Sequence, residues 1–522
     1  MRTELDLALA PQDAADPQRA AAAVAQELGL APGSTPAFRV LRRSVDARRK
    51  PIAVNLHVQA AVGEPLPALE EPLLRYGDVS DREPVVIVGA GPAGLFAALR
   101  LIEAGLKPVL LERGRDVSAR KRDIALIHRE HLLNPESNYC FGEGGAGTFS
   151  DGKLYTRSKK RGDNRRALDI LLFHGASPEI LFEAHPHIGS DKLPTIIAAI
   201  RRTILQSGGE IHFETRVDGL VLRDGAATGV RTGAGDTIPG RAVILATGHS
   251  ARDVYEMLLR QGLQLEAKGF AMGVRIEHPQ ALINAIQYNR DPSQIPYLPP
   301  AAYTLVHQAG GRGVYSFCMC PGGFIVPAAT APGETVVNGM SASLRSSPFA
   351  NAGFVVEIRT EDTGAYASHG PLAGLRFQQE LEQSAFRHAG GGQTAPAQRA
   401  TDFAAGRDSR DLPESSYLPG LSVSPLHAWL PPAIGARLKE GLQAFDRKMR
   451  GFLTREAVLV GVESRTSSPV RIPRDRETLQ HVQIRGLYPC GEGAGYAGGI
   501  LSSAIDGENC AAAAAAWLGA TV

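Results

Sequence analysis

The chain has 522 residues, of which 43% are hydrophobic and 21% charged, and its formal net charge is +2. This is the composition of an ordinary soluble globular protein, and the length predicts two or three domains. The near-neutral charge gives no reason to expect a membrane surface or a nucleic acid as partner. No signal-peptide pattern or membrane-spanning apolar run is present, and the five cysteines are sparse and odd in number. We therefore expect a cytoplasmic protein with reduced thiols.

Residues 1–62 predict a small N-terminal domain with the element order β-α-β-β. Apolar and polar residues alternate at 4–10, Asp16 is placed to cap an Ala-rich helix ending near residue 28, and strands are expected at 38–45 and 52–62. A basic set near the second strand either binds an anionic partner such as RNA or forms a solvated hairpin: Arg42, Arg43, Arg48, Arg49 and Lys50. The net charge favours the hairpin. The Pro-spaced residues 63–83 predict a linker.

Residues 84–112 carry the strongest signal. A β-branched run at 85–88 predicts a buried strand, an apolar helix follows to about residue 104, and a second apolar run ends on Glu112. The loop between them has the Gly-x-Gly-x-x-Gly fingerprint of a dinucleotide-binding βαβ unit: Gly89, Ala90, Gly91, Pro92, Ala93 and Gly94. We expect a pyrophosphate at the helix N-terminus and an adenosine ribose at Glu112.

Two further stretches follow Glu112. The basic residues of 113–122, Arg113 and Arg120 among them, are predicted to flank the pyrophosphate. Residues 141–153, FGEGGAGTFSDGK, are the densest glycine cluster of the chain. Many glycines suit a loop that presses its backbone N–H groups against a flat ligand, although a merely flexible loop is the alternative. The interleaved aromatic residues favour the ligand-binding interpretation, with these contacts: Gly144, Gly145, Ala146, Gly147 and Thr148.

The rest of the chain predicts a divided domain with an insertion. A helix is expected at 194–206, and strands at 210–214, 217–222 and 241–247, the last ending in Gly248-His249. Residues 251–455 are rich in Pro and Gly, with strands near 272–276 and 324–326 and helices near 372–388 and 433–450. Residues 458–462 and 479–484 are predicted to lead back to the main sheet, and a final helix to cover 501–518. We thus expect a substrate or cap domain at 251–455, inserted between two parts of one domain, 84–250 and 456–522.

Three separated pieces resemble the glutathione-reductase-like FAD fold: the fingerprint, the ATG segment Ala246-Thr247-Gly248, and Gly491-Glu492-Gly493. The resemblance implies that the second piece passes close to the flavin nucleotide and that Glu492 contacts the ribityl chain, where an Asp is more usual. It also implies that Gly498, Gly499 and Ile500 lie at the flavin O2 edge, where a helix N-terminus stabilises negative charge. Val217 is included among the expected cofactor contacts.

More closely, nearly the whole chain resembles the uncharacterised bacterial FAD-dependent, or NAD(FAD)-utilising, dehydrogenase family. The shared motifs are NYCFGEGGAGTFSDGK at 138–153, FCMCPGG at 317–323 and ESRTSSPVRIPRD at 463–475. The resemblance implies an α/β fold with a Rossmann-like FAD-binding domain, an inserted mixed α+β cap and a small N-terminal α+β domain. It further implies an FAD-dependent oxidoreductase acting on a small molecule. NAD(P)H is open as a transient reductant, since only one complete nucleotide fingerprint is present.

Two other function classes stay open: a flavin monooxygenase, and an RNA- or partner-binding protein with a structural flavin. The substrate and the oligomeric state are not predicted. Cys318 and Cys320 either exchange electrons or bind substrate, or are inert buried thiols on one face of a strand. His249 either acts as acid or base near the ring or caps a helix. Arg465 either binds an anionic substrate or cofactor or joins domains. No metal site is predicted.

Overall fold

Residues 2–61 fold into a three-stranded antiparallel sheet with two helices on it. The strand order is β1 (Arg2–Leu9), β3 (Ala53–Ala61), β2 (Ala37–Asp46). The apolar face packs against α1 (Pro11–Ala15) and α2 (Pro17–Glu27). Asp16 caps α2 and accepts hydrogen bonds from the backbone N–H groups of Gln18 and Arg19. The predicted β-α-β-β order and the helix cap are confirmed in this computed structural model, which describes residues 2–31, 33–48, 51–68, 74–155, 163–288 and 295–520.

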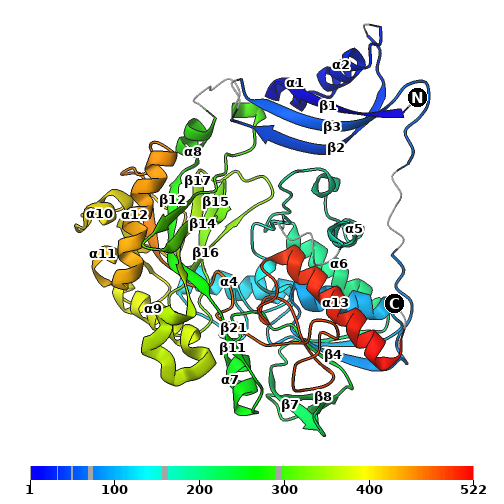
Figure 1. Cartoon of the computed structure of the whole chain (residues 1–522), viewed down its shortest axis with the longest axis vertical. Coiled ribbons are helices and arrows are strands. Elements are labelled where there is room, and N and C mark those ends of the chain that lie inside the picture. Colours follow the sequence, from blue (N-terminus) through cyan, green and yellow to red (C-terminus); the bar gives the residue numbers. More distant parts are fainter. Residues whose placement is uncertain are drawn as a thin grey trace.

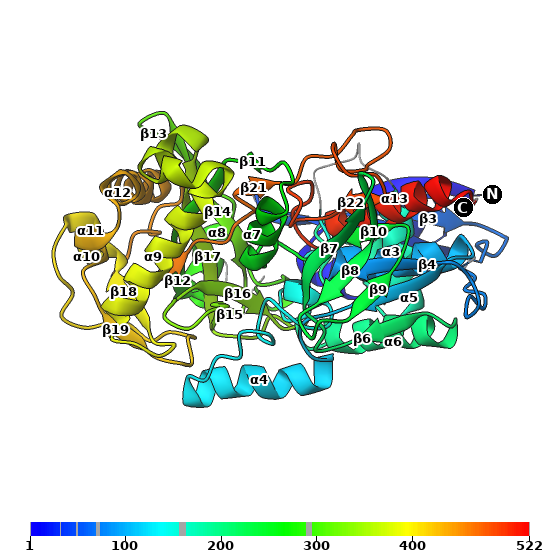
Figure 2. The same ribbon diagram turned by 90° about the horizontal axis from the view of Figure 1, so that it is seen from below.

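A five-stranded parallel sheet carries the fingerprint (Figures 1 and 2). Its order is β22 (Leu487–Pro489), β10 (Val243–Leu245), β4 (Pro84–Val88), β5 (Lys107–Leu111), β6 (Glu210–His212). Both faces are covered, which is why the strands are continuous apolar runs. One face packs on α3 (Pro92–Glu103), α5 (Asn164–Phe173), α6 (Leu193–Gln206) and α13 (Ile500–Leu518). The other packs on α7 (Arg252–Arg260) and an antiparallel sheet of β7 (Val217–Arg223), β8 (Ala226–Thr232) and β9 (Thr237–Pro239).

A second lobe is built on a seven-stranded sheet, drawn in green to orange in Figure 1. Its order is β13 (Val306–Ala309), β14 (Arg312–Cys320), β17 (Phe349–Ile358), β12 (Phe270–Pro279), β20 (Val458–Glu463), β18 (Ala395–Arg399), β19 (Leu421–Val423). Its core contains α8 (Gln280–Gln287), α9 (Ala373–Ala389), α10 (Ala400–Ala405), α11 (Leu426–Trp429) and α12 (Pro432–Lys448). We call this the cap lobe and the first the sheet lobe. The helices predicted at 372–388 and 433–450 are confirmed as α9 and α12.

Smaller elements join the two lobes. The two-stranded ladder β11 (Glu266–Ala267) with β21 (Val470–Arg471) lies between them, and the hairpin β15 (Gly323–Pro327) with β16 (Val337–Ser341) belongs to the cap lobe. The helix α4 (Val117–Glu130) runs along the underside of both (Figure 2). Three short 3-10 segments and one longer one complete the described elements: η1 (Gly145–Gly147), η2 (Pro178–Leu181), η3 (Ile295–Tyr297) and η4 (Thr360–Leu372).

Two predicted elements of the returning chain are wrong. β20 does not lead back to the parallel sheet but lies inside the cap sheet, between β12 and β18. Residues 479–484 form no strand and contribute only an isolated bridge from His481 to Arg474. A buried apolar run fits any strand covered on both faces, so its sequence does not tell which sheet it joins. The cap lobe therefore extends past residue 455.

The N-terminal sheet spans the top of both lobes (Figure 1). Arg43 bridges to the sheet lobe, where its backbone pairs with Phe182 and Ala184 and its guanidinium binds Glu183. Ile52 packs in the core of the cap lobe. Of the predicted basic set, Arg48 pairs with Asp46, while Arg49 and Lys50 lie outside the described residues, as do 69–73 of the predicted linker. Within the described ranges, no helix has the length and apolar character to cross a membrane.

Candidate active site

The three motif segments meet at the carboxyl ends of β4, β10 and β22. Glycine spacing shows how closely they pack: a Cβ at Gly89 would lie 2.5 Å from the carbonyl O of Ala246, and one at Gly493 would lie 2.5 Å from that of Gly248. A Cβ at Gly94 would lie 1.9 Å from the carbonyl O of Gly89, as expected where helix and strand need close contact. The glycines therefore hold the three segments together as one unit.

Two helix N-termini and the glycine-rich loop converge beside that unit. Gly91 is the N-cap of α3, and Gly499 is the N-cap of α13. The η1 turn lies against both, because a Cβ at Gly145 would be 3.1 Å from the Cα of Gly91 and one at Gly147 would be 3.2 Å from the Cγ1 of Ile500. Free N–H groups and the positive end of the helix dipole favour an anion at such a place.

The backbone around these helix starts faces open space. A Cβ added to Gly248, Gly498 or Gly499 would meet no atom within 4 Å, and Ala146 at the tip of η1 is exposed. The loops thus form a cradle. Because its glycines have no side chains, the cradle leaves space that a dinucleotide can occupy. Pro92 begins α3 and Ala93 is buried behind it, against Gly491. Thr247 is half-buried beside Gly248.

Glu112 is buried at the end of β5, with 5% of its surface exposed. Its carboxylate accepts hydrogen bonds from the backbone N–H groups of Ala90 (2.8 Å), Gly114 (2.8 Å) and Gly142 (3.0 Å). A carboxylate offers about four lone-pair directions, so it can accept one more hydrogen bond, as a ribose hydroxyl would donate. Glu112 also ties the fingerprint to the glycine-rich loop.

Several predicted ligand contacts are instead part of the scaffold. Arg120 is fully buried and donates to the carbonyl groups of Asn138, Tyr139 and Glu143, so it holds the glycine-rich loop from behind and does not flank a ligand. Burial lowers its pKa to about 10. Thr148 is also buried and donates to the carbonyl O of Glu143.

Three other residues that were predicted to contact the ligand are instead packed against, or paired with, other parts of the protein. Gly144 is buried, and a Cβ there would collide with Ile197. The side chain of Val217 packs in the apolar core at the start of β7. Arg113 is half-buried, pairs with Glu136 and Asp253 and lies 4.3 Å from the centre of the Phe141 ring. The local composition predicted that these cationic and small residues contact a ligand. In the structure, carboxylates and carbonyl groups of the protein itself bind the cationic side chains.

The Gly491–Gly493 turn is fixed by a buried ion pair that the sequence did not predict. Asp506 on α13 accepts a hydrogen bond from the backbone N–H of Gly491 (2.7 Å) and pairs with Arg474 (2.6 Å). Arg474 also donates to the Sγ of Cys510, close to Cys490. The ligand atoms of Cys490, Asp506 and Cys510 lie within 4.8 Å of one another, the spacing of a metal site, but the guanidinium already supplies their positive charge.

Glu492 and His249 face each other between the two lobes. His249 Nε2 lies 3.9 Å from a carboxylate oxygen of Glu492. Burial, with the positive charges of Arg465, Lys268 and Arg252, lowers the pKa of His249 to about 4, so its imidazole is neutral. Burial raises the pKa of Glu492 to about 7, helped by the negative charge of Cys318.

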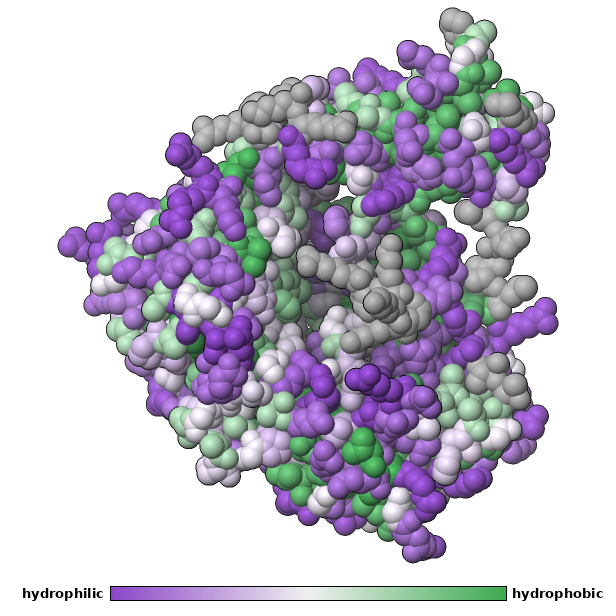
Figure 3. All heavy atoms as spheres, viewed as in Figure 1, coloured by the Kyte–Doolittle hydropathy of each residue, from purple (hydrophilic) through white to green (hydrophobic). Residues whose placement is uncertain are grey.

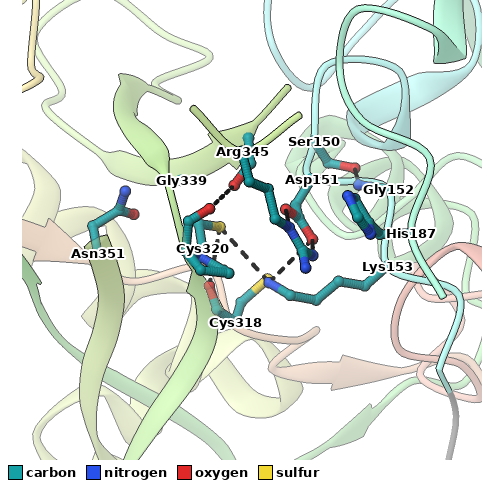
Figure 4. Close-up of polar contacts among 12 residues, drawn as sticks. Ser150, Asp151, Gly152, Lys153, His187, Cys318, Cys320, Gly339, Arg345 and Asn351 are labelled. Carbon is teal, nitrogen blue, oxygen red and sulfur yellow. Dashed lines mark hydrogen bonds and ion pairs between the residues drawn. The ribbon is translucent and has the colours of Figure 1, made fainter. Parts of the chain in front are cut away.

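Cys318 on β14 of the cap lobe acts electrostatically on Glu492 and lies beside Lys153 of the glycine-rich loop (Figure 4). We call the surface formed by Lys153, His249, Lys268, Cys318 and Glu492 the lobe junction. A register shift between Phe317 and Cys320 bulges β14, and Cys318 has a φ of 45°. Cys318 is exposed and Cys320 buried, and both are free thiols. The predicted regular strand is therefore interrupted at this motif.

Lys153 is the main functional candidate that sequence reasoning missed. Its ammonium lies 3.8 Å from the Sγ of Cys318, 3.7 Å from the Sγ of Cys320 and 3.6 Å from Asp151. Asp151 in turn pairs with Arg345 (2.7 Å). The only available signal was the Asp-Gly-Lys end of the glycine-rich loop, which names no partner in the cap lobe.

Arg465 lies in a buried network and not on a free surface. It pairs with Glu382 (2.8 Å) and Glu334 (3.1 Å), and its remaining Nη donates to Thr330. Arg252 on α7 binds the same two carboxylates at 2.7 and 3.0 Å. Burial and the neighbouring Glu382 raise the pKa of Glu334 to about 7. The network joins α7 of the sheet lobe to α9 of the cap lobe, which favours the domain-joining alternative for Arg465.

Comparisons with known proteins fit this geometry. Residues 82–130 match a model of an FAD binding domain, 194–331 a model of FAD dependent oxidoreductases, and 269–466 a model described as FAD-dependent protein, C-terminal domain-like. Residues 1–61 match a domain of unknown function. An uncharacterized protein of Clostridium beijerinckii is 41% identical over 505 residues, which covers 93% of each chain. The two proteins belong to one family.

More distant likenesses are partial. Thiamine thiazole synthase of Aeropyrum pernix is 28% identical over 150 residues, 28% of this chain and 43% of that one. A geranylgeranyl bacteriochlorophyll reductase-like structure from Thermoplasma acidophilum is 13% identical, with a TM-score of 0.36 over 84% of this chain and 79% of that one. The matching domain models alone show that the family is one of FAD-dependent oxidoreductases and that FAD is the cofactor of this chain.

Proposed function

We propose that this FAD-dependent oxidoreductase is a dehydrogenase or reductase that acts on a small molecule at the lobe junction, with NAD(P)H as a transient reductant. The observation that carries the proposal is the His249–Glu492 pair. A neutral imidazole lies 3.9 Å from a carboxyl whose pKa is raised to about 7, beside the open backbone of Gly498 and Gly499. Such a pair can hold or release one proton near neutral pH.

The residues present fit FAD, which when bound supplies hydride and electron transfer. Glu112 has a free lone pair for the adenosine ribose, and the N-terminus of α3 at Gly91 and Pro92 suits the pyrophosphate. Glu492 is the carboxyl available to the ribityl chain. Gly498, Gly499 and Ile500 at the start of α13 form the backbone beside the proposed ring edge, where the N–H groups of Gly498 and Gly499 donate to Ser502 and Glu492. The Gly145–Gly147 turn closes the cradle opposite them.

His249 is the proton-handling residue in this proposal. It follows the Ala246–Gly248 turn and is held between Glu492 and the positive charges of Arg465, Lys268 and Arg252. Those charges and burial keep it neutral, so it can pass a proton to or from Glu492, which is the member of the pair that holds a proton near neutral pH. Arg465 and Arg252 are positioning residues, because both are occupied by Glu334 and Glu382.

The test separates cofactor binding from proton transfer. The protein is mixed anaerobically with NADH or NADPH while the absorbance of the oxidised flavin is followed. We expect His249→Asn to retain FAD but to slow flavin bleaching about 100-fold, the usual size of a lost acid–base group. Glu492→Gln should instead lose FAD on gel filtration. Bleaching by neither nucleotide, or equal rates in wild type and His249→Asn, would contradict the proposal.

An oxygen electrode distinguishes the other flavoenzyme class. A dehydrogenase or reductase should consume NAD(P)H in proportion to substrate and independently of dissolved oxygen. Oxygen uptake that rises with substrate and matches NAD(P)H consumption would assign a monooxygenase and overturn the proposal.

A further inference from the structure

The thiols of Cys318 and Cys320 both lie close to the ammonium group of Lys153. Lys153 Nζ is 3.8 Å from the first sulfur and 3.7 Å from the second, so a single cation serves both thiols (Figure 4). The β14 bulge places Cys318 at the exposed surface of the lobe junction while Cys320 stays buried behind it. One thiol is thus accessible to a small molecule, and the other is accessible only to its neighbour.

The charges around the pair favour a thiolate at Cys318. A hydrogen bond from the Cys320 thiol holds the pKa of Cys318 well below its ordinary value, and Lys153 and Arg275 act in the same direction against burial. Burial and the same hydrogen bond raise the pKa of Cys320. The Cys320 Sγ also lies 3.3 Å from the carbonyl O of Cys318 and 3.6 Å from the Nη2 of Arg275.

The surrounding charged groups hold Lys153 and Arg275 in place. Asp151 pairs with Lys153 and, on its other side, with Arg345. Arg275 is fully buried, pairs with Glu463 (2.7 Å) and donates to the carbonyl O of Cys318 (2.9 Å), which fixes the bulge. Burial would lower the pKa of Lys153, but the negative charges of Cys318 and Asp151 keep it above its ordinary value. The negative charge of Cys318 also raises the pKa of Glu492 in the sheet lobe.

We propose that Cys318 and Cys320 form a thiol–disulfide exchange centre for small-molecule disulfides, with Cys318 as attacking thiolate, Cys320 as resolving thiol and Lys153 as the cation that holds the thiolate. The geometry points to this division of roles because the exposed sulfur and the buried sulfur share one ammonium group. The centre goes beyond the proposed function, since the exchange itself needs no flavin.

The exchange balances without another reactant. The Cys318 thiolate attacks one sulfur of R–S–S–R, the S–S bond breaks, R–S⁻ leaves and a mixed disulfide forms on Cys318. The Cys320 thiol passes its proton to the departed R–S⁻, giving R–SH, and the new thiolate attacks the Cys318 sulfur. The mixed disulfide breaks, a second R–S⁻ leaves, and the chain holds a Cys318–Cys320 disulfide. The cysteine pair is oxidised, and one small disulfide is reduced to one thiol and one thiolate, so that protons and charge balance.

The experiment uses the full-length holoprotein and bis(2-hydroxyethyl) disulfide, followed by peptide mass mapping. Wild type should lose two hydrogen atoms within the peptide containing 318–320. Cys320→Ser should trap one hydroxyethylthio group on Cys318, and Cys318→Ser should acquire neither modification at Cys320. The half-buried Cys140 is the matched control, and Cys140→Ser should behave as wild type. Dithiothreitol should reverse every adduct.

A second measurement does not depend on the cysteine variants folding. The rate at which iodoacetamide alkylates Cys318 is followed in the intact protein from pH 5 to 9. Lys153→Met should slow alkylation at pH 7 about tenfold, because the thiolate fraction falls, and Lys153→Arg should restore most of the rate. Flavin absorbance is recorded in parallel, so loss of cofactor is distinguished from loss of thiol reactivity. Alkylation of Cys318 at the wild-type rate in Lys153→Met, or labelling of Cys140 ahead of Cys318, would overturn the proposal.

Discussion

The two sides of the lobe junction are made of different parts of the polypeptide. The sheet lobe presents backbone: Gly91 and Gly145 pack closely against each other, and Gly498 and Gly499 leave open space where side chains would stand. The cap lobe presents side chains, with Cys318 placed by a strand bulge that Arg275 fixes from inside. A hollow between the lobes is visible in Figure 3, beneath the N-terminal sheet.

This difference predicts which kind of substitution disrupts each side of the lobe junction. A backbone surface depends on local conformation and close contact, so it fails when a Cβ is added. A side-chain surface depends on buried charge pairs, so it fails when one partner is removed. Arg275 and Glu463 are both buried in the cap lobe, whereas the cradle of the sheet lobe contains Glu112 with backbone partners alone.

The largest effect is expected from removing the buried cation of the cap lobe. Arg275→Met leaves Glu463 unpaired in the core and frees the carbonyl O of Cys318. Losing one partner of a buried pair costs about 3–5 kcal/mol of the free energy of unfolding. Urea unfolding measures it. Arg231→Met removes an exposed pair with Asp218 and should cost at most about 1 kcal/mol. Equal losses in the two variants would remove the basis of the comparison.

A smaller loss is expected from adding one methyl group to the sheet lobe. In Gly94→Ala the new Cβ would lie 1.9 Å from the carbonyl O of Gly89, so α3 must move away from β4. Such overpacking costs about 1–3 kcal/mol, and the displaced helix start should retain less FAD. Gly364→Ala is the control, because its Cβ would meet no atom within 4 Å. Thermal unfolding and the ratio of flavin to protein absorbance measure both effects; a Gly94→Ala protein with wild-type values would contradict the close-packing argument.

The backbone side was predictable from sequence because its signals are local. Gly89, Gly91 and Gly94 mark a turn, a close approach and a helix contact within six residues, and the flanking strand and helix confirm their context. Asp16 at the start of α2 was predictable for the same reason. Local patterns failed where a cation had two sets of available partners: Arg120 and Arg465 suggested ligand anions, yet internal carbonyl groups and carboxylates bind them.

The side-chain side was not predictable, because its contacts are distant in the chain. Lys153 and Cys318 are 165 residues apart, and neither local pattern names the other. The bulge at Cys318 depends on the register with β17, which a strand pattern does not encode. β20 shows the same limit, since its apolar run fits either sheet equally well and only tertiary pairing places it beside β12.

A still smaller effect on stability, but a clear one on cofactor, is expected at the open part of the cradle. Gly498→Val adds a side chain where no atom lies within 4 Å, so the free energy of unfolding should change by no more than about 0.5 kcal/mol. The same side chain would fill the space proposed for the flavin, so the purified protein should be colourless. Gly364→Val, at a site far from the cradle in sequence and equally open, should stay yellow. Yellow Gly498→Val protein would show that the ring lies elsewhere.

The smallest effect is expected in the pH dependence of the free energy of unfolding, to which His249 and Glu492 contribute with opposite signs. His249 has a pKa of about 4 in the folded chain against 6.5 ordinarily, because of burial and nearby cations. Between those values the unfolded chain binds more protons, so its contribution to stability rises with pH. Glu492 has a pKa raised to about 7 from 4.5, chiefly by burial, so the folded chain binds more protons there and its contribution falls with pH.

From pH 4.5 to 6.5 the two contributions therefore largely cancel in the FAD-free chain. Glu492→Gln removes the falling contribution, and its free energy of unfolding should rise more steeply with pH than that of wild type. His249→Asn removes the rising one and should show a shallower or falling slope. Urea unfolding at pH 4.5, 5.5 and 6.5 measures the three slopes. If Glu492→Gln and His249→Asn shift the slope in the same direction, the two groups do not titrate as opposed neighbours, and the proton-sharing pair on which the proposed function rests is absent.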